Sequence, residues 1–103
     1  MSPFLSAVAH VSALLGPADA TEHNGDADAT IARWGDPAGA NLTVRHYGIT
    51  GSVVLVAERR DDDREWRAIG DATVRDACAW LSWEVPRPSR VGYDANGSPV
   101  EAA

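Results

Sequence analysis

The spacing of the apolar residues changes twice along this chain, and this change constrains the fold more than any other feature. Between Ser2 and Pro17 apolar residues recur at helical spacing, after Asp28 they alternate in several runs, and beyond Gly70 helical spacing returns. Alternation is typical of half-buried strands, whereas spacings of three and four residues are typical of amphipathic helices. The expected order is therefore a helix, several strands and a second helix.

The N-terminal segment SPFLSAVAHVSALLGP predicts a helix with defined ends. Ser2 can cap its N-terminus, and Pro3 suits the first turn. The pair Gly16 and Pro17 stops the helix. The polar, glycine-containing residues that follow, ADATEHNGDA, are expected to form a loop. The apolar stripe of the helix comprises Phe4, Val8, Val11 and Leu15, widened by Leu5 and Leu14.

Four consecutive strands are expected before Gly70. The first follows Asp28 and carries the alternating residues Thr30, Ala32 and Trp34. The next three are NLTVRHYG, SVVLVAER and REWRAIG, of which SVVLVAER is the most hydrophobic and should be central in the sheet. Because the connections are short, the strands should form an antiparallel meander. The run Asp61, Asp62 and Asp63 is then expected near the tip of the last hairpin.

The segment GDATVRDACAWLSWEVP predicts the second helix, with Asp71 as its N-cap and Pro86 as its stop. Residues 1–94 are expected to form one α+β domain of order α-β-β-β-β-α. In this domain a four-stranded antiparallel meander has an N-terminal and a C-terminal helix packed on one face, and a partner could bind the other face. Residues 95–103 are expected to be a flexible tail. The apolar stripe of the second helix comprises Val74, Ala77, Cys78 and Leu81.

Charge and cysteine content exclude several classes of function. The formal net charge of −6 disfavours direct binding to nucleic acid or to an anionic membrane, and it suits a basic protein partner. The single cysteine, Cys78, excludes an internal disulfide and a multi-cysteine zinc site, and it fits a reducing compartment. No apolar run approaches the roughly 20 residues that a membrane helix needs. We therefore expect a cytoplasmic protein that is not integral to a membrane.

The segment ERRDDDREW, residues 58–66, contains the only acidic run of the chain. Successive side chains of an extended chain point to opposite faces, so three adjacent aspartates cannot converge on one cation. Oxygen-ligand loops instead place carboxylates at alternate positions beside a glycine. Two interpretations remain for this segment. It is either a solvated hairpin tip screened by its flanking arginines or a surface that contacts a basic partner.

No group of residues has the spacing of a catalytic or metal site. His10, His23 and His46 have no ligand partner at helical or zinc-finger spacing. Cys78 lies on the core stripe of a predicted helix, where a nucleophile would lack exposure. The sequence has no nucleophile elbow and no glycine-rich phosphate loop. We expect no catalytic residue, no metal and no cofactor.

Four tryptophans are many for a chain of this size. Trp80 and Trp83 are three residues apart in the second predicted helix, so the two rings flank its apolar stripe. Aromatic residues beside arginines and carboxylates are typical of interface hot spots. The alternative, in which all four tryptophans fill a small core, stays open.

The order of the predicted elements resembles that of the immunity proteins of bacterial polymorphic toxin systems, in the family that includes guards against nucleic-acid deaminase toxins. The meander NLTVRHYGITGSVVLVAER and the acidic turn after it occur in a similar order in that family. The most specific similarity is the ending AWLSWEVPRPSRVGYD, in which an arginine–proline pair precedes a hydrophobic residue, an aromatic residue and an acid. The tyrosine departs from the tryptophan usual there, and the chain is short for the family. These positions are Arg87, Pro88, Val91, Tyr93 and Asp94.

The resemblance implies a non-catalytic protein that neutralises a cognate bacterial toxin by covering its active site. An acidic domain suits a toxin with a basic, nucleic-acid-binding cleft, because opposite charge speeds capture and buried aromatic residues lengthen residence. On this hypothesis Asp61, Asp62, Asp63 and Glu65 steer the toxin, Trp66, Trp83 and Tyr93 anchor it, and Glu84 and Asp94 are further candidates.

Two other classes of function remain open. A structural or adaptor subunit could self-associate through an exposed strand edge or a tryptophan-bearing face, which would produce a homo-oligomer. A small-molecule-binding domain could use the open sheet face, with Arg45, His46 and Tyr47 as its polar groups.

Overall fold

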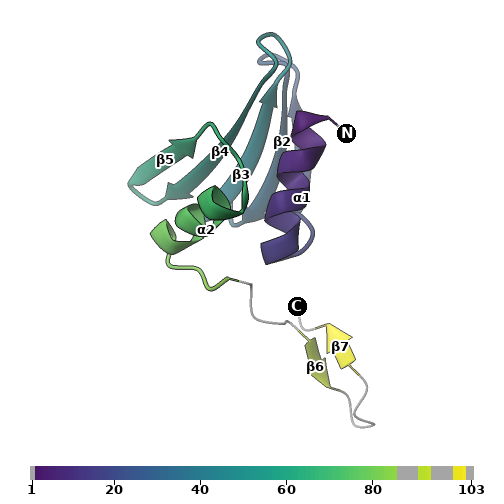
Figure 1. The fold of residues 1–103 in the computed structure, drawn as a ribbon, viewed down its shortest axis with the longest axis vertical. Helices are drawn as coiled ribbons and strands as arrows, with labels where there is room; N and C mark the ends of the chain where they lie inside the picture. The colour runs from purple at the N-terminus through teal and green to yellow at the C-terminus, as the bar shows by residue number, and fades with distance from the viewer. Residues whose placement is uncertain (1, 86–90, 94–98, 102–103) are drawn as a thin grey trace.

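The computed structural model describes residues 2–85, 91–93 and 99–101. The fold is α+β, with two helices and a main antiparallel sheet (Figure 1). The helices are α1 (Pro3–Leu15) and α2 (Asp71–Trp80). Between them lie the strands β1 (Ala20–Asn24), β2 (Ala29–Gly35), β3 (Asn41–Tyr47), β4 (Ser52–Arg59) and β5 (Asp62–Trp66). Two short strands follow α2, namely β6 (Val91–Tyr93) and β7 (Pro99–Glu101).

Strands β1 to β5 form one antiparallel sheet in the order in which they occur in the sequence. The predicted meander is confirmed, but this sheet has five strands rather than four. The additional strand is β1, which lies in the segment expected to be a loop. It joins the sheet by backbone pairing with β2, and all five of its residues are exposed. Because β1 buries no side chain, no apolar alternation marks it in the sequence.

The last strand of the hairpin, β5, starts and ends earlier than the predicted strand REWRAIG. The turn before it lies at Arg60 and Asp61, and β5 ends at Trp66. Asp61 lies in the turn, and Asp62 and Asp63 follow it directly, near the tip as expected, as strand residues paired with β4. A solvated edge strand accepts charged side chains, so pairing with the long apolar strand β4 extends β5 into the acidic run.

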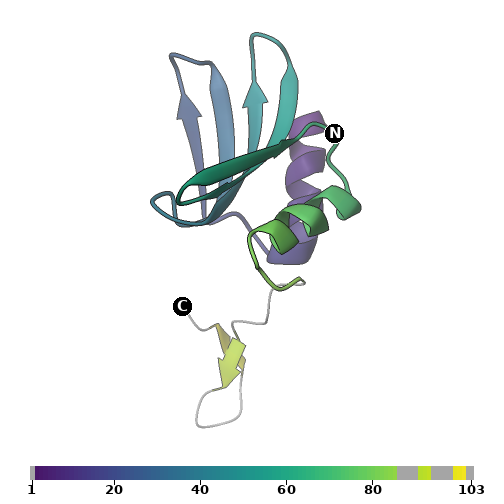
Figure 2. The ribbon, with the colours of Figure 1, turned by 90° about the vertical axis from the view of Figure 1, so that its left-hand side faces the viewer.

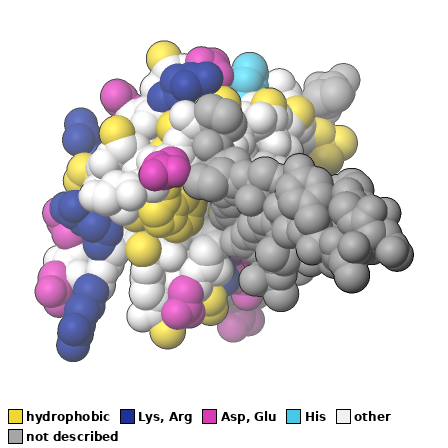
Figure 3. Space-filling view, turned by 90° about the horizontal axis from the view of Figure 1, so that it is seen from below, with side chains coloured by type: hydrophobic (Ala, Val, Ile, Leu, Met, Phe, Trp, Pro, Cys, Tyr) yellow, Lys and Arg dark blue, Asp and Glu magenta, His cyan; other side chains and the backbone are white. Residues whose placement is uncertain are grey.

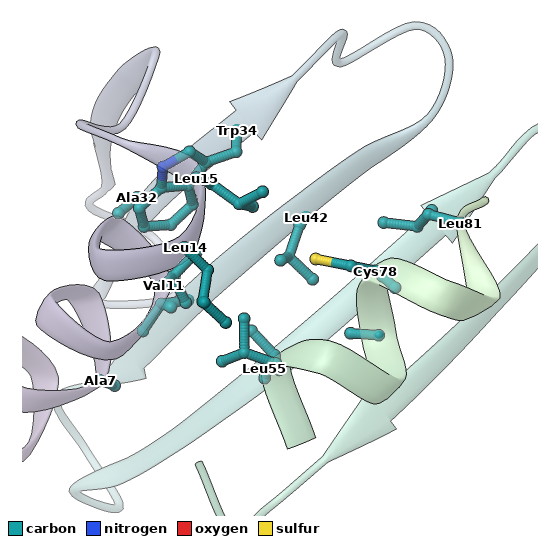
Figure 4. Packing of buried hydrophobic residues seen from close by; sticks show 14 residues of the cluster. Ala7, Val11, Leu14, Leu15, Ala32, Trp34, Leu42, Leu55, Cys78 and Leu81 are labelled. Carbon is teal, nitrogen blue, oxygen red and sulfur yellow. The ribbon is translucent and has the colours of Figure 1, made fainter. Parts of the chain in front are cut away.

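Both helices pack on the same face of the sheet, as expected, and the hydrophobic core lies between them and the strands (Figure 2). At its centre Trp34 is fully buried, and its indole Nε1 donates a hydrogen bond of 2.8 Å to the carbonyl oxygen of Gly16. This bond ties β2 to the end of α1. The core shown in Figure 4 comprises Ala32, Trp34, Leu42, Val44, Leu55 and Ala57 from the strands, Ala7, Val11, Leu14 and Leu15 from α1, and Val74, Ala77, Cys78 and Leu81 from α2 and its C-cap.

The two helices differ in detail from their predictions. Helix α2 ends at Trp80, before the expected stop at Pro86, and Ser82 after it adopts a left-handed φ of 62°. A left-handed residue just beyond a helix reverses the chain direction, which explains the early end. In α1, Leu5 is 56% exposed instead of widening the buried stripe. Cys78 is fully buried, in agreement with its predicted packing role.

The face of the sheet that points away from the helices is called the open face below. Thr43, Val54 and Val56 lie on it and are 0%, 4% and 3% exposed, although both described helices cover the other face. Arg45 lies opposite Val54 in the register and donates from Nε to the Thr43 hydroxyl at 3.0 Å. Its guanidinium also pairs with Glu58 at 2.6 Å. The arginine stem therefore covers apolar parts of the open face, as long charged side chains often do.

Strands β6 and β7 pair with each other as a separate two-stranded sheet, in a segment that shows no periodicity in the sequence. Residues 94–98, 102 and 103 lie outside the described residues, so the flexible tail over 95–103 stays a prediction. Neither of the helices found in the described segments is long and apolar enough to span a membrane.

Candidate partner-binding surface

Strand alternation sorts the charges of the β4–β5 hairpin onto two faces. Glu58 and Asp63 lie opposite each other in the register. Trp66 packs against the core and so faces the helices, which directs Asp63 and Glu65 to the open face. Three carboxylates, those of Glu58, Asp63 and Glu65, therefore share the open face along β4 and β5, beside the turn that contains Asp61.

Two arginines of the same hairpin are held on the helix side by tryptophans. The guanidinium of Arg59 lies 3.8 Å from the ring centroid of Trp80 and donates to the Trp80 backbone oxygen at 3.1 Å. Arg59 also pairs with Asp62 at 3.6 Å. The guanidinium of Arg64 lies 5.3 Å from the ring centroid of Trp66. These cation–π contacts hold two positive charges away from the open face.

Three carboxylates of the hairpin lack a partner within the part of the chain that the structure describes. Asp61, Asp63 and Glu65 are exposed, and their carboxylates make no hydrogen bond or ion pair with a described residue. Hairpin residues, among them Glu58, border a hollow of about 350 Å³. Figure 3 shows acidic and basic side chains close together along its left side, where β5 lies in Figure 1. Exposed carboxylates without a partner create a negative potential that attracts a basic surface.

The tryptophans predicted to anchor a partner are half-buried. Trp66 and Trp83 pack against the hydrophobic core. A Cβ built at Gly35 would lie 3.0 Å from Cη2 of Trp83, so this ring closes against the end of β2. A partner can therefore contact only the exposed edges of these two rings. Their role as anchors stays a prediction.

The structure brings one part of the predicted site together. Asp61, Asp62, Asp63, Glu65 and Trp66 share one hairpin, and the Arg59–Trp80 contact links it to the end of α2, just before Trp83. Glu84 is exposed and directly follows Trp83. Tyr93 lies in β6, but its side chain and the whole of Asp94 are outside the described residues.

A hollow on the open face is lined by residues that, apart from Tyr47 and Glu65, the sequence did not single out. It has a volume of about 360 Å³ and lies between the β3–β4 turn and β5. Tyr47, Ile49 and Val54 supply its apolar wall, and Glu65 and Arg67 supply its charged side. Ile49 is 82% exposed. An isoleucine in a turn, between a glycine and a threonine, is the one sequence signal for this surface.

Arg45, His46 and Tyr47 are the residues expected to bind a small molecule together, but their side chains do not lie on one face. The prediction that the three form one site is therefore wrong. Arg45 and Tyr47 are on the open face, whereas His46 faces the helices, with its ring centroid 6.1 Å from that of Phe4. Adjacent residues of a strand point to opposite faces, so these three side chains cannot converge. Arg45 is engaged with Glu58, and of the three only Tyr47 lines the hollow.

The histidines are also dispersed. His23 lies 3.8 Å from Asp28 beside the β1–β2 turn, and His46 lies next to Phe4 under α1. Across residues 2–85 and the two short strands that follow, no three His, Cys, Asp or Glu side chains are arranged to hold a metal ion.

Comparisons with models of protein families, with curated proteins and with solved structures find no match to this chain. The fold and the surface define its class as a small α+β domain with an acidic sheet edge. Its function must be inferred from the chemistry of that surface.

Proposed function

We propose that this chain is a non-catalytic binding protein that captures a basic protein partner on its β4–β5 hairpin. The observation that carries the proposal is the division of charge in this hairpin. Within the described part of the chain, Asp63 and Glu65 have no charge partner on the open face, whereas Arg59 and Arg64 are held by tryptophans on the other side. A segment with five acids and three arginines therefore presents mainly negative charge to a partner on the open face.

The arrangement of these acids does not serve the stability of the fold. Asp63 lies directly opposite Glu58, and like charges at opposed positions disfavour a sheet, although the Glu58–Arg45 ion pair offsets part of this repulsion. Local features that cost stability without an evident structural gain are typical of functional sites. Binding of a basic partner would remove the remaining repulsion and supply ion pairs to Asp63 and Glu65.

The partner that fits is a bacterial toxin that acts on nucleic acid. Such a toxin needs a basic cleft to bind phosphates, and an acidic hairpin is complementary to that cleft. The ending AWLSWEVPRPSRVGYD supports this choice, because it resembles that of immunity proteins. The chain would then neutralise its cognate toxin by covering the active site.

Co-purification from the native host tests the identity of the partner. The captured domain is then produced alone and together with this chain. The proposal expects a stable complex with a basic toxin domain whose activity in vitro is lost in the complex and whose toxicity to cells is relieved by co-expression. An acidic partner, or a toxin that stays fully active in the complex, would contradict the proposal.

The contribution of the hairpin is tested with the double variant D63N/E65Q. Its association rate with the captured toxin should fall about tenfold at low salt, and the difference should shrink at high salt, because screening removes long-range attraction. The control is D26N/D76N, which removes two negative charges at exposed positions outside the hairpin. Equal losses in the two variants would show that net charge, and not this hairpin, steers association.

A further inference from the structure

The hollow beside β5 has the size and wall of a small-molecule site. Its volume of about 360 Å³ is near the lower end of the range for such sites, which suits a ligand with a single ring or a branched aliphatic group. Val54 is 4% exposed and Tyr47 is half-buried, so part of the wall is held in place by the sheet. Ile49 extends this wall into solvent at the β3–β4 turn.

Two opposite charges line the same hollow and are not used within the described chain. The carboxylate of Glu65 and the guanidinium of Arg67 make no hydrogen bond or ion pair with a described residue, including each other. Their Cα atoms are two residues apart in sequence and therefore at most about 7 Å apart in space. An ammonium group and a carboxylate on one small molecule can bind both side chains at once through charge-assisted hydrogen bonds.

We propose that this hollow binds a free α-amino acid with an apolar side chain, such as phenylalanine. The ligand ammonium pairs with Glu65, the ligand carboxylate accepts hydrogen bonds from the fork of Arg67, and the side chain lies against Tyr47, Ile49 and Val54. The hydroxyls of Thr50 and Ser52, bonded to each other at 3.0 Å, lie at the same hollow and add polar contacts. This binding goes beyond the proposed function, because it requires no protein partner.

Titration with L-phenylalanine, followed by backbone amide NMR shifts, tests the site directly. We expect saturable shifts with a dissociation constant on the order of 1 mM, confined to residues around the hollow. Three analogues separate the contributions: 3-phenylpropionate lacks the ammonium, phenethylamine lacks the carboxylate, and L-alanine lacks the ring. Each should bind about tenfold more weakly than L-phenylalanine.

Single substitutions test whether Arg67 binds the ligand carboxylate and Glu65 binds the ligand ammonium. R67Q should reduce L-phenylalanine binding about tenfold and leave phenethylamine binding unchanged, because phenethylamine has no carboxylate. E65Q should also reduce L-phenylalanine binding about tenfold, and it should leave 3-phenylpropionate binding unchanged, because that ligand has no ammonium. The matched controls are R60Q and D61N, whose positions are exposed in the turn outside this hollow. Both controls should bind L-phenylalanine as the parent chain does.

Three results would overturn the proposal: shifts that do not saturate, saturable shifts that map to another surface, or binding by R67Q and E65Q as tight as by the controls. None of these results depends on the toxin, so the amino-acid site and the proposed function fail or stand separately. R67Q is informative in this respect, because Arg67 has no part in the acidic surface proposed to bind a toxin.

Discussion

At the scale of single residues, Gly35 at the end of β2 lies close to the backbone of the β2–β3 turn. Gly35 has a φ of +101°, and a Cβ built there would lie 2.6 Å from the backbone oxygen of Ala40 and 3.0 Å from Trp83. A backbone oxygen cannot move aside as the end of a flexible side chain can. Only glycine therefore fits between the β2–β3 turn and the Trp83 ring.

The substitution G35A should lower the free energy of unfolding by roughly 2 kcal/mol or more, because it combines an unfavourable φ with a clash. The control is G25A, in the β1–β2 turn, where an added Cβ would meet no atom within 4 Å. We expect a change of about 0.5 kcal/mol or less for this control. Urea denaturation of both variants measures the difference, and similar stabilities would show that the β2–β3 turn relaxes around the methyl group.

At the scale of elements, the β4–β5 hairpin shows how one strand pair serves two faces. Its helix side carries Trp66 and the two stacked arginines, which add to the core and to the contact with α2. Its open side carries opposed carboxylates, Glu58 and Asp63. Glu58 is paired with Arg45, so the weak point of the open face of the hairpin is Asp63, and this face is stabilised less than the helix side.

The variant D63K tests this description. Lysine opposite Glu58 replaces a repulsive cross-strand pair with an attractive one, so the free energy of unfolding should rise by about 0.2–1 kcal/mol at low salt. D61K is the control, because Asp61 lies in the turn and changes the net charge equally. If urea denaturation shows the same gain in both variants, the gain comes from net charge and not from the cross-strand pair.

At the scale of the whole molecule, the net charge and the two edges of the main sheet disfavour self-association. The formal net charge is −6, and the edge strand β5 carries exposed acids that discourage pairing with another copy. The other edge, β1, is fully exposed and contains Glu22. Antiparallel pairing of two β1 strands about their central residue would oppose the two Glu22 carboxylates.

We therefore expect light scattering to give the mass of one chain at micromolar concentration and low salt. Raising the salt concentration should not produce a dimer, because the edges offer no apolar strip to replace the screened repulsion. A dimer mass under either condition would instead favour the alternative of a self-associating structural or adaptor subunit.

The spacing of apolar residues predicts most of the helices and strands, because most of these elements bury one face. Helix α1 and strands β2, β3 and β4 are close to their predicted positions. Strand β1 and the first residues of β5 were missed for a single reason: their side chains are exposed, and they join the sheet through the backbone. The early end of α2 was missed because the left-handed turn at Ser82 has no marker such as glycine in the sequence.

The sequence by itself determined the order of the main elements, most of the core residues and the sign of the net charge, because these depend on local spacing and composition. Only the tertiary structure decided which charges are left for a partner or a ligand. Arg59 is held by Trp80, 21 residues away, and Glu58 by Arg45, 13 residues away. Such pairs depend on how distant elements pack, so the folded chain alone shows that Glu65 lines a hollow and has no partner among the described residues.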